Sequence, residues 1–213
     1  MQTPVAAHKT PRPRADALRN RERIVTAARE MFVEYGPDVP LDEIARRAGV
    51  GNATLYRNFS DRDALVRQLI HSVMDRTIKA AQIALEQDSD PFTALERFVH
   101  TVAAERISAL CPMIARRFDQ HHSGPEAVAQ QVELLVSEVM DRARAAGQLR
   151  PDVGVGDLMI AIAQLSRPPA GTQCLGIDRV MHRHLQMFLD GLRTPAQSVL
   201  PGATVALEDL RHP

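Results

Sequence analysis

Apolar residues recur at the spacing of an α-helix along most of this chain, and this period constrains the fold more than any other feature. The first stripe follows the pattern i, i+3, i+4, i+7, i+8, i+11 and consists of Ile24, Ala27, Ala28, Met31, Phe32 and Tyr35. Later stripes run through 66–85, 95–110, 128–143 and 180–192. No segment alternates apolar and polar residues for long enough to indicate a half-buried strand. The sequence therefore predicts an all-α fold.

Composition limits the classes of protein to which this chain can belong. Its 213 residues are 45% hydrophobic, which is enough to bury a core and excludes wholesale disorder. No apolar run is long enough to cross a bilayer, so we expect no membrane partner. The basic, proline-rich N-terminus lacks the apolar stretch of a signal peptide, which favours a cytoplasmic protein.

Catalytic and metal-binding patterns are missing from the sequence. Cys111 and Cys174 are far apart in the chain and form no metal motif, and the histidines at 121–122 and at 182 and 184 lack metal-ligand spacing. We also find no phosphate-binding glycine loop, zinc-protease motif or nucleophile elbow. We therefore expect no enzyme activity, no metal and no cofactor.

Residues 40–59 predict two short helices joined by a tight turn. Ile44 and Ala45 should face inward, and the small Ala45 lets the second helix approach closely. Gly49 supplies the positive φ that the turn needs, and Val50 and Leu55 fill the inside of the corner. This pattern is typical of a helix-turn-helix, whose second helix enters the major groove of DNA.

A longer string of residues carries a resemblance to a known family. The string IA-x-x-AGV-x-x-x-TLY-x-x-F, followed by Arg62 and Leu65 and preceded by a helix that ends in F-x-x-x-G, resembles the tetracycline-repressor (TetR) family of bacterial transcription regulators. The resemblance is close over residues 17–70. Beyond them it is architectural, although the string AAGxLRPD at 145–152 also looks like a joint common in this family.

The resemblance implies a set of DNA contacts on and beside the second helix of the motif. Base edges would be read by Asn52, Ala53 and Thr54, because Asn pairs with adenine and methyl groups touch thymine. Phosphates would be held by Tyr56, Asn58 and Arg62, and Arg57 would reach either a base or the backbone.

Several positions depart from the family's pattern. Family members often have Thr where this chain has Pro40, so a hydroxyl contact to phosphate is lost, and Asp42 would repel a phosphate if it pointed that way. Gly51 stands where Ser is common, which removes a side-chain cap from the second helix. Asn52 could take over that capping role in place of its role in reading a base.

The resemblance also implies that the C-terminal helices pair two copies of the chain into a homodimer. The segment Leu158–Leu165 is apolar almost all round, which indicates burial on several sides, against a partner or within a larger internal core. The candidate interface residues are Leu158, Ile162, Leu165, Val180, His184, Met187 and Phe188. Family members usually hold a small molecule between the helices that follow the DNA-binding domain. The residues that would line such a pocket, or would simply belong to the core, are Phe92, Phe98, His100, Met113, Phe118, Leu135 and Met140.

The chain divides into four predicted segments. Residues 1–15 form a disordered basic arm, 16–62 the three-helix DNA-binding domain, 63–193 a helical ligand-binding and dimerisation domain, and 194–213 a flexible tail. Residues 1–62 carry 11 Lys and Arg against 8 Asp and Glu, a net charge of +3 that the rest of the chain balances. This charge asymmetry has two interpretations, an anionic partner at the N-terminal end or an arm that is merely solvated. In the first interpretation the basic arm could reach along DNA.

Together these observations predict a sequence-specific DNA-binding regulator. Its partners would be a palindromic operator in double-stranded DNA, a second copy of itself and a small-molecule effector that releases a repressor from DNA. One alternative is an all-α ligand-binding or scaffolding protein without DNA binding, and another is a small helical enzyme. Only the regulator predicts DNA binding that weakens steeply with salt.

Overall fold

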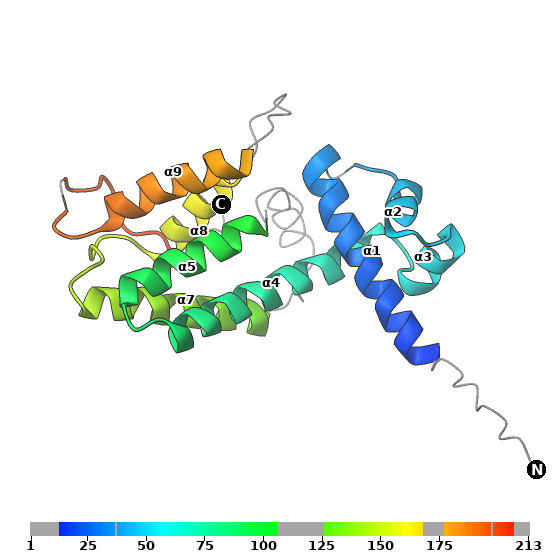
Figure 1. Ribbon diagram of the computed structural model, residues 1–213, viewed down its shortest axis with the longest axis horizontal. Helices are drawn as coiled ribbons and strands as arrows, with labels where there is room; N and C mark the ends of the chain where they lie inside the picture. Colours follow the sequence, from blue (N-terminus) through cyan, green and yellow to red (C-terminus); the bar gives the residue numbers. More distant parts are fainter. Residues whose placement is uncertain (1–12, 37, 106–125, 168–176, 197, 207–213) are drawn as a thin grey trace, which may run out of the picture. The chain divides into compact units, whose positions relative to one another are not determined.

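The computed structural model describes residues 13–36, 38–105, 126–167, 177–196 and 198–206. Within these residues it contains eight helices and no strand; the only extended pairing there is a single bridge between Leu149 and Arg193 (Figure 1). The chain separates into two compact units between Leu69 and Ile70. The all-α prediction is confirmed.

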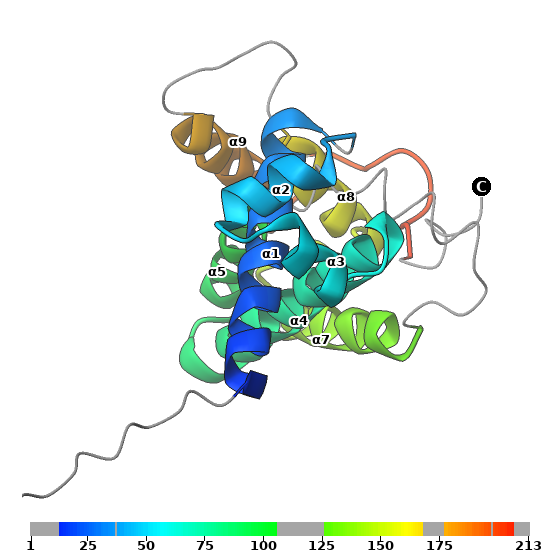
Figure 2. The same ribbon diagram turned by 90° about the vertical axis from the view of Figure 1, so that its right-hand side faces the viewer.

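The first unit contains three helices and the start of a fourth, which are α1 (Pro13–Tyr35), α2 (Leu41–Ala48), α3 (Asn52–Asn58) and α4 (Arg62–Gln87). Figures 1 and 2 show α2 and α3 packed against one side of α1. The second unit contains the rest of α4 together with α5 (Pro91–Ala104), α7 (Glu126–Ala145), α8 (Val155–Leu165) and α9 (Ile177–Leu192). None of the helices that the structure describes is long and apolar enough to cross a membrane.

The core of the first unit forms from the stripe that the sequence predicts on α1, with one exception. Ile24, Ala28 and Phe32 on α1 are fully or almost fully buried, as are Ile44 on α2, Leu55 on α3 and Leu65 on α4. Tyr35, which we expected in the same stripe, is 63% exposed. It is the last residue of α1, and the chain turns away at Gly36, where φ is 89°. No further turn of helix therefore follows to cover its ring.

The first helix begins earlier than the sequence suggests. Periodic apolar residues predicted a helical start after a disordered arm of residues 1–15, but α1 begins at Pro13. Proline is favourable in the first turn of a helix because the N–H that it lacks has no partner there. The rest of the predicted arm, residues 1–12, lies outside the described residues.

The core of the second unit is built around α5, which Figure 1 shows lying between α7 and α9 with α8 behind it. Phe92, Leu95 and Phe98 are fully buried there. The start of α5 is fixed by local contacts, because the Asp90 carboxylate accepts a hydrogen bond of 2.8 Å from the backbone N–H of Thr93 and proline occupies the first turn.

Described residues of the segment after α9 are hydrogen-bonded to the second unit, although we expected a flexible tail from residue 194 onward. The N–H of Gly156 donates to the carbonyl of Val205 at 2.9 Å, and the Arg150 guanidinium donates to the carbonyl of Ser198 at 2.7 Å. A Cβ on Gly156 would lie 2.6 Å from the Val205 oxygen. The missing side chain therefore lets one backbone lie directly against another, and this close approach was not evident from the sequence.

Candidate nucleic-acid interface

The turn between α2 and α3 has the geometry that the sequence predicts. Gly49 has φ of 63° and ψ of 37°, the left-handed conformation that glycine adopts without strain. The N–H of Gly49 donates to the carbonyl of Arg46 at 3.1 Å, and the N–H of Val50 donates to that of Ala45 at 3.0 Å. These bonds close α2 and direct the chain at once into α3, so the helix-turn-helix is confirmed.

Helix α3 presents a polar outer face. Leu55 is 1% exposed and anchors the helix to the core, whereas Asn52, Ala53 and Arg57 are exposed and Tyr56 is 51% exposed. Gly51 is the N-cap, so Asn52 is the first residue of the helix and its side chain does not serve as the cap. Except for Arg62, which lies at the start of α4, the residues that we expected to read base edges and to touch phosphate therefore lie on this one short helix.

Two of these side chains are partly engaged within α3. One amide hydrogen of Asn58 is donated to the carbonyl of Thr54 at 2.8 Å, and Nε of Arg57 donates to the carbonyl of Ala53 at 3.1 Å. Each bond spans one turn and orients the side chain along the helix. The rest of the Arg57 guanidinium extends from an exposed side chain and offers further donors.

Arg62, which we expected to hold a phosphate, makes contacts within its own unit. Its side chain is half-buried, donates to the carbonyl of Val39 and lies over the ring of Phe32 with 6.0 Å between the guanidinium carbon and the ring centre. Arg62 thus ties the loop before α2 to the start of α4. Its contact with phosphate remains a prediction.

The start of α4 is capped by the side chain of Asp61. The Asp61 carboxylate accepts a hydrogen bond of 2.7 Å from the N–H of Ala64 and another of 2.9 Å from the hydroxyl of Ser60. The bond from Ala64 is the main reason that the pKa of Asp61 is lowered, because it stabilises the charged form. The loop that follows α3 is thereby fixed to the next helix.

A cluster around Arg21 was missed in the sequence. Its guanidinium donates to the carbonyl of Asn58 at 2.9 Å and to Oε1 of Gln68 at 2.8 Å, and it lies 4.5 Å from the centre of the Phe59 ring. The contacts join α1, the end of α3 and α4. In the sequence, Arg21 is one of several basic residues in a row, so nothing there singles it out.

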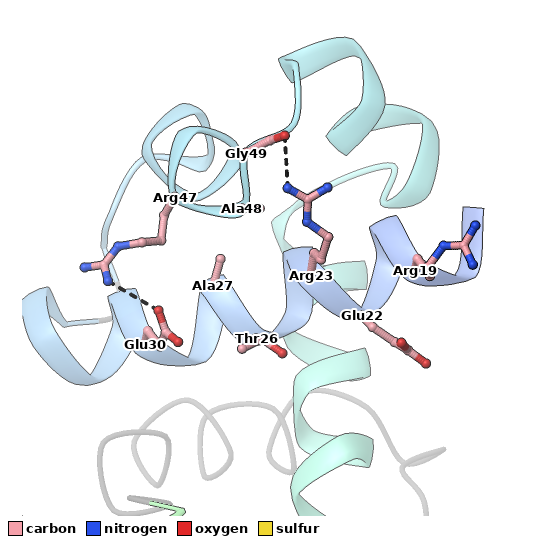
Figure 3. Close-up of a pocket in the computed structure, with 9 residues that line it drawn as sticks. All are labelled: Arg19, Glu22, Arg23, Thr26, Ala27, Glu30, Arg47, Ala48 and Gly49. Atoms are coloured by element: carbon pink, nitrogen blue, oxygen red, sulfur yellow. Dashed lines mark hydrogen bonds and ion pairs between the residues drawn. The ribbon is translucent and has the colours of Figure 1, made fainter. Parts of the chain in front are cut away.

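An open groove of about 470 Å³ lies between α1 and the end of α2 (Figure 3). Its lining residues are Arg19, Glu22, Arg23, Thr26, Ala27, Glu30, Arg47, Ala48 and Gly49. Across it, Arg47 forms ion pairs with Glu30 at 3.3 Å and with Glu34, and Nη2 of Arg23 donates to the Gly49 carbonyl at 3.3 Å. The hydrogen bond to Glu34 is the largest cause of the raised pKa of Arg47. These pairs hold α2 and the turn against α1.

The residues predicted to line a ligand pocket are scattered in the second unit. Phe92, Phe98 and Met140 belong to its buried core, and Leu135 packs against that core. His100 is half-buried, with its Nδ1 2.9 Å from Nδ1 of His182 on α9. Met113 and Phe118 lie outside the described residues. The pocket itself stays a prediction.

The residues predicted for a dimer interface fall into two groups. Leu158 and Ile162 are 0% and 2% exposed in the core of their own chain, so assigning them to a partner was wrong. They lie on the face of α8 that packs inward. Val180 and Met187 are 46% and 61% exposed, His184 is exposed, and Leu165 and Phe188 are half-buried.

In the described part of the chain, no group of three or more His, Cys, Asp or Glu residues is arranged to hold a metal ion.

Two families match this chain, one for each unit. Residues 24–69 match the family described as bacterial regulatory proteins of the tetR family, and residues 90–194 match the C-terminal domain of SbtR-like transcriptional regulators. These two ranges cover the helix-turn-helix and most of the helices that follow it.

Individual relatives agree with the family matches. The HTH-type transcriptional regulator TtgW of Pseudomonas putida, described as uncharacterized, is 32% identical over 50% of this chain and 74% of its own length. The TetR regulator SCO0520 of Streptomyces coelicolor is 30% identical, with a TM-score of 0.61 over 83% of this chain and 99% of its own. The TetR-like regulator LfrR of Mycobacterium smegmatis, solved in complex with proflavine, has a TM-score of 0.61 over 87% of this chain and 99% of its own, but its 21% identity shows a common fold alone.

The helix-turn-helix at Gly49, the exposed polar face of α3 and the match of both units agree on one assignment. Members of the matched families are transcriptional regulators and not enzymes. This chain therefore belongs to the TetR family of transcriptional regulators, with an N-terminal helix-turn-helix DNA-binding domain.

Proposed function

We propose that this protein is a homodimeric repressor that binds a palindromic operator and is released from it by a small molecule. The observation that carries the proposal is the exposed face of α3, where short polar groups project from a helix that is anchored by the buried Leu55. A helix of this kind fits the major groove, where the edges of the base pairs differ in their donors and acceptors.

The proposed contacts divide by chemistry. Asn52, Ala53 and Thr54, in the first turn of α3, contact base edges and set sequence preference. The phosphate backbone is contacted by Tyr56, Arg57, Asn58 and Arg62. Arg62 would have to exchange its bond to the Val39 carbonyl for a phosphate oxygen, or donate to both.

A dimer is supported by apolar side chains left on the surface of α8 and α9. Ile160, Val180 and Met187 are each more than a third exposed, although they belong to helices whose other faces are buried. One recognition helix reads only a few base pairs, and a two-fold pair of helices on two half-sites supplies the remaining affinity.

A small-molecule response is supported by the architecture alone. The proflavine bound to LfrR belongs to a protein that shares this fold. In our proposal an effector binds among the helices of the second unit and favours a state of the dimer with lower affinity for DNA.

Selection from a pool of random-sequence duplexes tests the proposal. We expect the purified protein to enrich a palindrome with half-sites about one helical turn apart, and the affinity for it to fall steeply as salt rises from about 50 to 200 mM. Tyr56→Phe should weaken binding to every duplex, whereas Thr54→Ala should relax preference at one position. Failure to enrich any sequence, or a monomer in sedimentation at the binding concentration, would contradict the proposal and favour the scaffolding alternative.

A further inference from the structure

The recognition helix is too short to hold its own orientation. Helix α3 has seven residues, and isolated helices of that length are marginal in water. Its N-cap is a glycine without a side-chain hydrogen bond, and Leu55 and the following Phe59 are its buried anchors. The direction of its outer face therefore depends on what holds its last turn.

Arg21 holds that last turn through three contacts. It donates to the carbonyl of Asn58, the final residue of α3, at 2.9 Å, and to Oε1 of Gln68 on α4 at 2.8 Å. The carbon atom of its guanidinium lies over the Phe59 ring, 4.5 Å from the ring centre. The carbonyl groups at the end of a helix lack partners within the helix, so a cation at this end is favourable.

The partners of Arg21 differ from those of three other arginines in this unit. Arg19, Arg46 and Arg47 each form an ion pair with a carboxylate on an exposed surface. The three contacts of Arg21 are a carbonyl, an amide and an aromatic ring, all uncharged, and its side chain is half-buried. The planar guanidinium of arginine suits these three partners, because its N–H groups donate in two directions while its face lies over an aromatic ring.

We propose that Arg21 is a positioning residue for DNA reading, which sets the orientation of α3 by joining its C-terminal carbonyl to Gln68 and Phe59. The proposal rests on the proposed contacts of α3 with DNA. Arg21 acts through the helix and does not itself touch the duplex. The base-reading residues at the other end of α3 depend on this orientation, since a small tilt of the helix moves their side chains relative to the base edges.

Two other roles for Arg21 make different predictions. A phosphate contact requires positive charge, so Lys would largely replace Arg, and removal of the charge would lower the salt dependence by about one counterion. A purely structural role would lower binding to all DNA in proportion to the loss of folded protein. A positioning role needs the two-directional donors and the planar face of the guanidinium, so Arg21→Lys loses this role although its charge is unchanged. Loss of a positioning role weakens binding to the specific duplex more than binding to non-specific DNA.

The experiment measures affinity and salt dependence for Arg21→Lys, Arg21→Met, Gln68→Leu and the double variant Arg21→Lys with Gln68→Leu. The probes are the duplex that the wild-type protein selects from a random pool and a scrambled duplex of equal length. Arg46→Lys is the matched control, because Arg46 is exposed on α2 and pairs with Glu43. Unfolding followed by tyrosine fluorescence gives the folded fraction of each variant.

We expect Arg21→Lys to bind the selected duplex about tenfold more weakly, with an unchanged salt slope, unchanged binding to the scrambled duplex and a folded fraction near one. Gln68→Leu should weaken specific binding less, and the double variant should be no weaker than Arg21→Lys, because both changes break one unit. If Arg21→Lys does not fold, the test uses Gln68→Leu alone. For this variant we measure the ratio of its affinity for the selected duplex to its affinity for the scrambled duplex, which should be lower than in the wild-type protein.

Wild-type affinity in Arg21→Lys would overturn the proposal, as would additive losses in the double variant or equal losses on both duplexes. These outcomes leave the proposed function intact, because the wild-type protein still selects a duplex. A wild-type protein that selects none overturns both.

Discussion

Replacement of Gly49 by alanine tests whether the left-handed turn determines the stability of the DNA-binding unit. The backbone at Gly49 has φ of 63° and ψ of 37°, where a residue with a Cβ costs about 1–2 kcal/mol. The new Cβ would lie 2.7 Å from Nη2 of Arg23, so that flexible guanidinium must move and its bond to the Gly49 carbonyl is lost. This exposed bond contributes about 0.5 kcal/mol.

One effect of the same substitution acts in the opposite direction. Alanine restricts the unfolded chain more than glycine does, which favours folding by about 0.4–1 kcal/mol. The net expectation for Gly49→Ala is a loss of about 1 kcal/mol in the free energy of unfolding, or roughly a fivefold change in the folding equilibrium. Gly49→Asn should lose less, because asparagine adopts the left-handed conformation more readily.

Tyrosine fluorescence during urea unfolding isolates the relevant unit. The chain has no tryptophan, and its two tyrosines, Tyr35 and Tyr56, both lie before the boundary between the units at Leu69. The matched control is Gly51→Ala, because Gly51 has φ of −74° and an added Cβ would meet nothing within 4 Å. We expect the control to stay within about 0.5 kcal/mol of wild type. Equal stability of Gly49→Ala and the wild-type protein, or equal losses in both variants, would refute the argument from the backbone.

Three further predictions concern other parts of the structure. The pKa of Asp90 is lowered from 3.8 to about 2, first by its hydrogen bond from Gln148 and then by those from Thr93, so its stabilising contribution is complete above about pH 4 and lost as the pH falls towards 2. Urea unfolding followed by circular dichroism should therefore depend less on pH in this range for Asp90→Asn, and parallel curves for the two proteins would contradict this. Gly156→Ala should destabilise the second unit by about 1–3 kcal/mol and expose residues 198–206 to proteolysis, because the Cβ would collide with backbone atoms; unchanged proteolysis would argue against the docked segment. Leu55→Ala should cost about 2–5 kcal/mol in tyrosine-detected unfolding, since it leaves a cavity beneath α3, and a loss below 1 kcal/mol would mean that the helix is anchored elsewhere.

The sequence alone determined the structural features that depend only on residues close together in the chain. The helical period of the apolar residues indicated an all-α fold, and Gly49 marked the turn, because only a residue without a Cβ adopts a positive φ freely. The helical pattern IA-x-x-AGV around that glycine was visible for the same reason, since a tight turn depends on residues that are neighbours in the chain.

Some expectations from the sequence failed because the helical period of apolar residues indicates which face of a helix is apolar, but not which part of the molecule packs against that face. Leu158 and Ile162 belong to an apolar helix, and the pattern could not decide whether they face their own core or a second chain. Tyr35 continues the apolar stripe of α1 in sequence but lies where the chain has already turned away.

Only the tertiary structure decided which polar groups meet. Arg21 contacts residues 37 and 47 positions later in the chain, and His100 faces His182 across 82 positions. Local sequence carries no record of such contacts, since each depends on how several helices pack together. The contact of Val205 with Gly156 is of the same kind. The glycine is visible in the sequence, but the backbone that lies beside it belongs to the segment that follows α9.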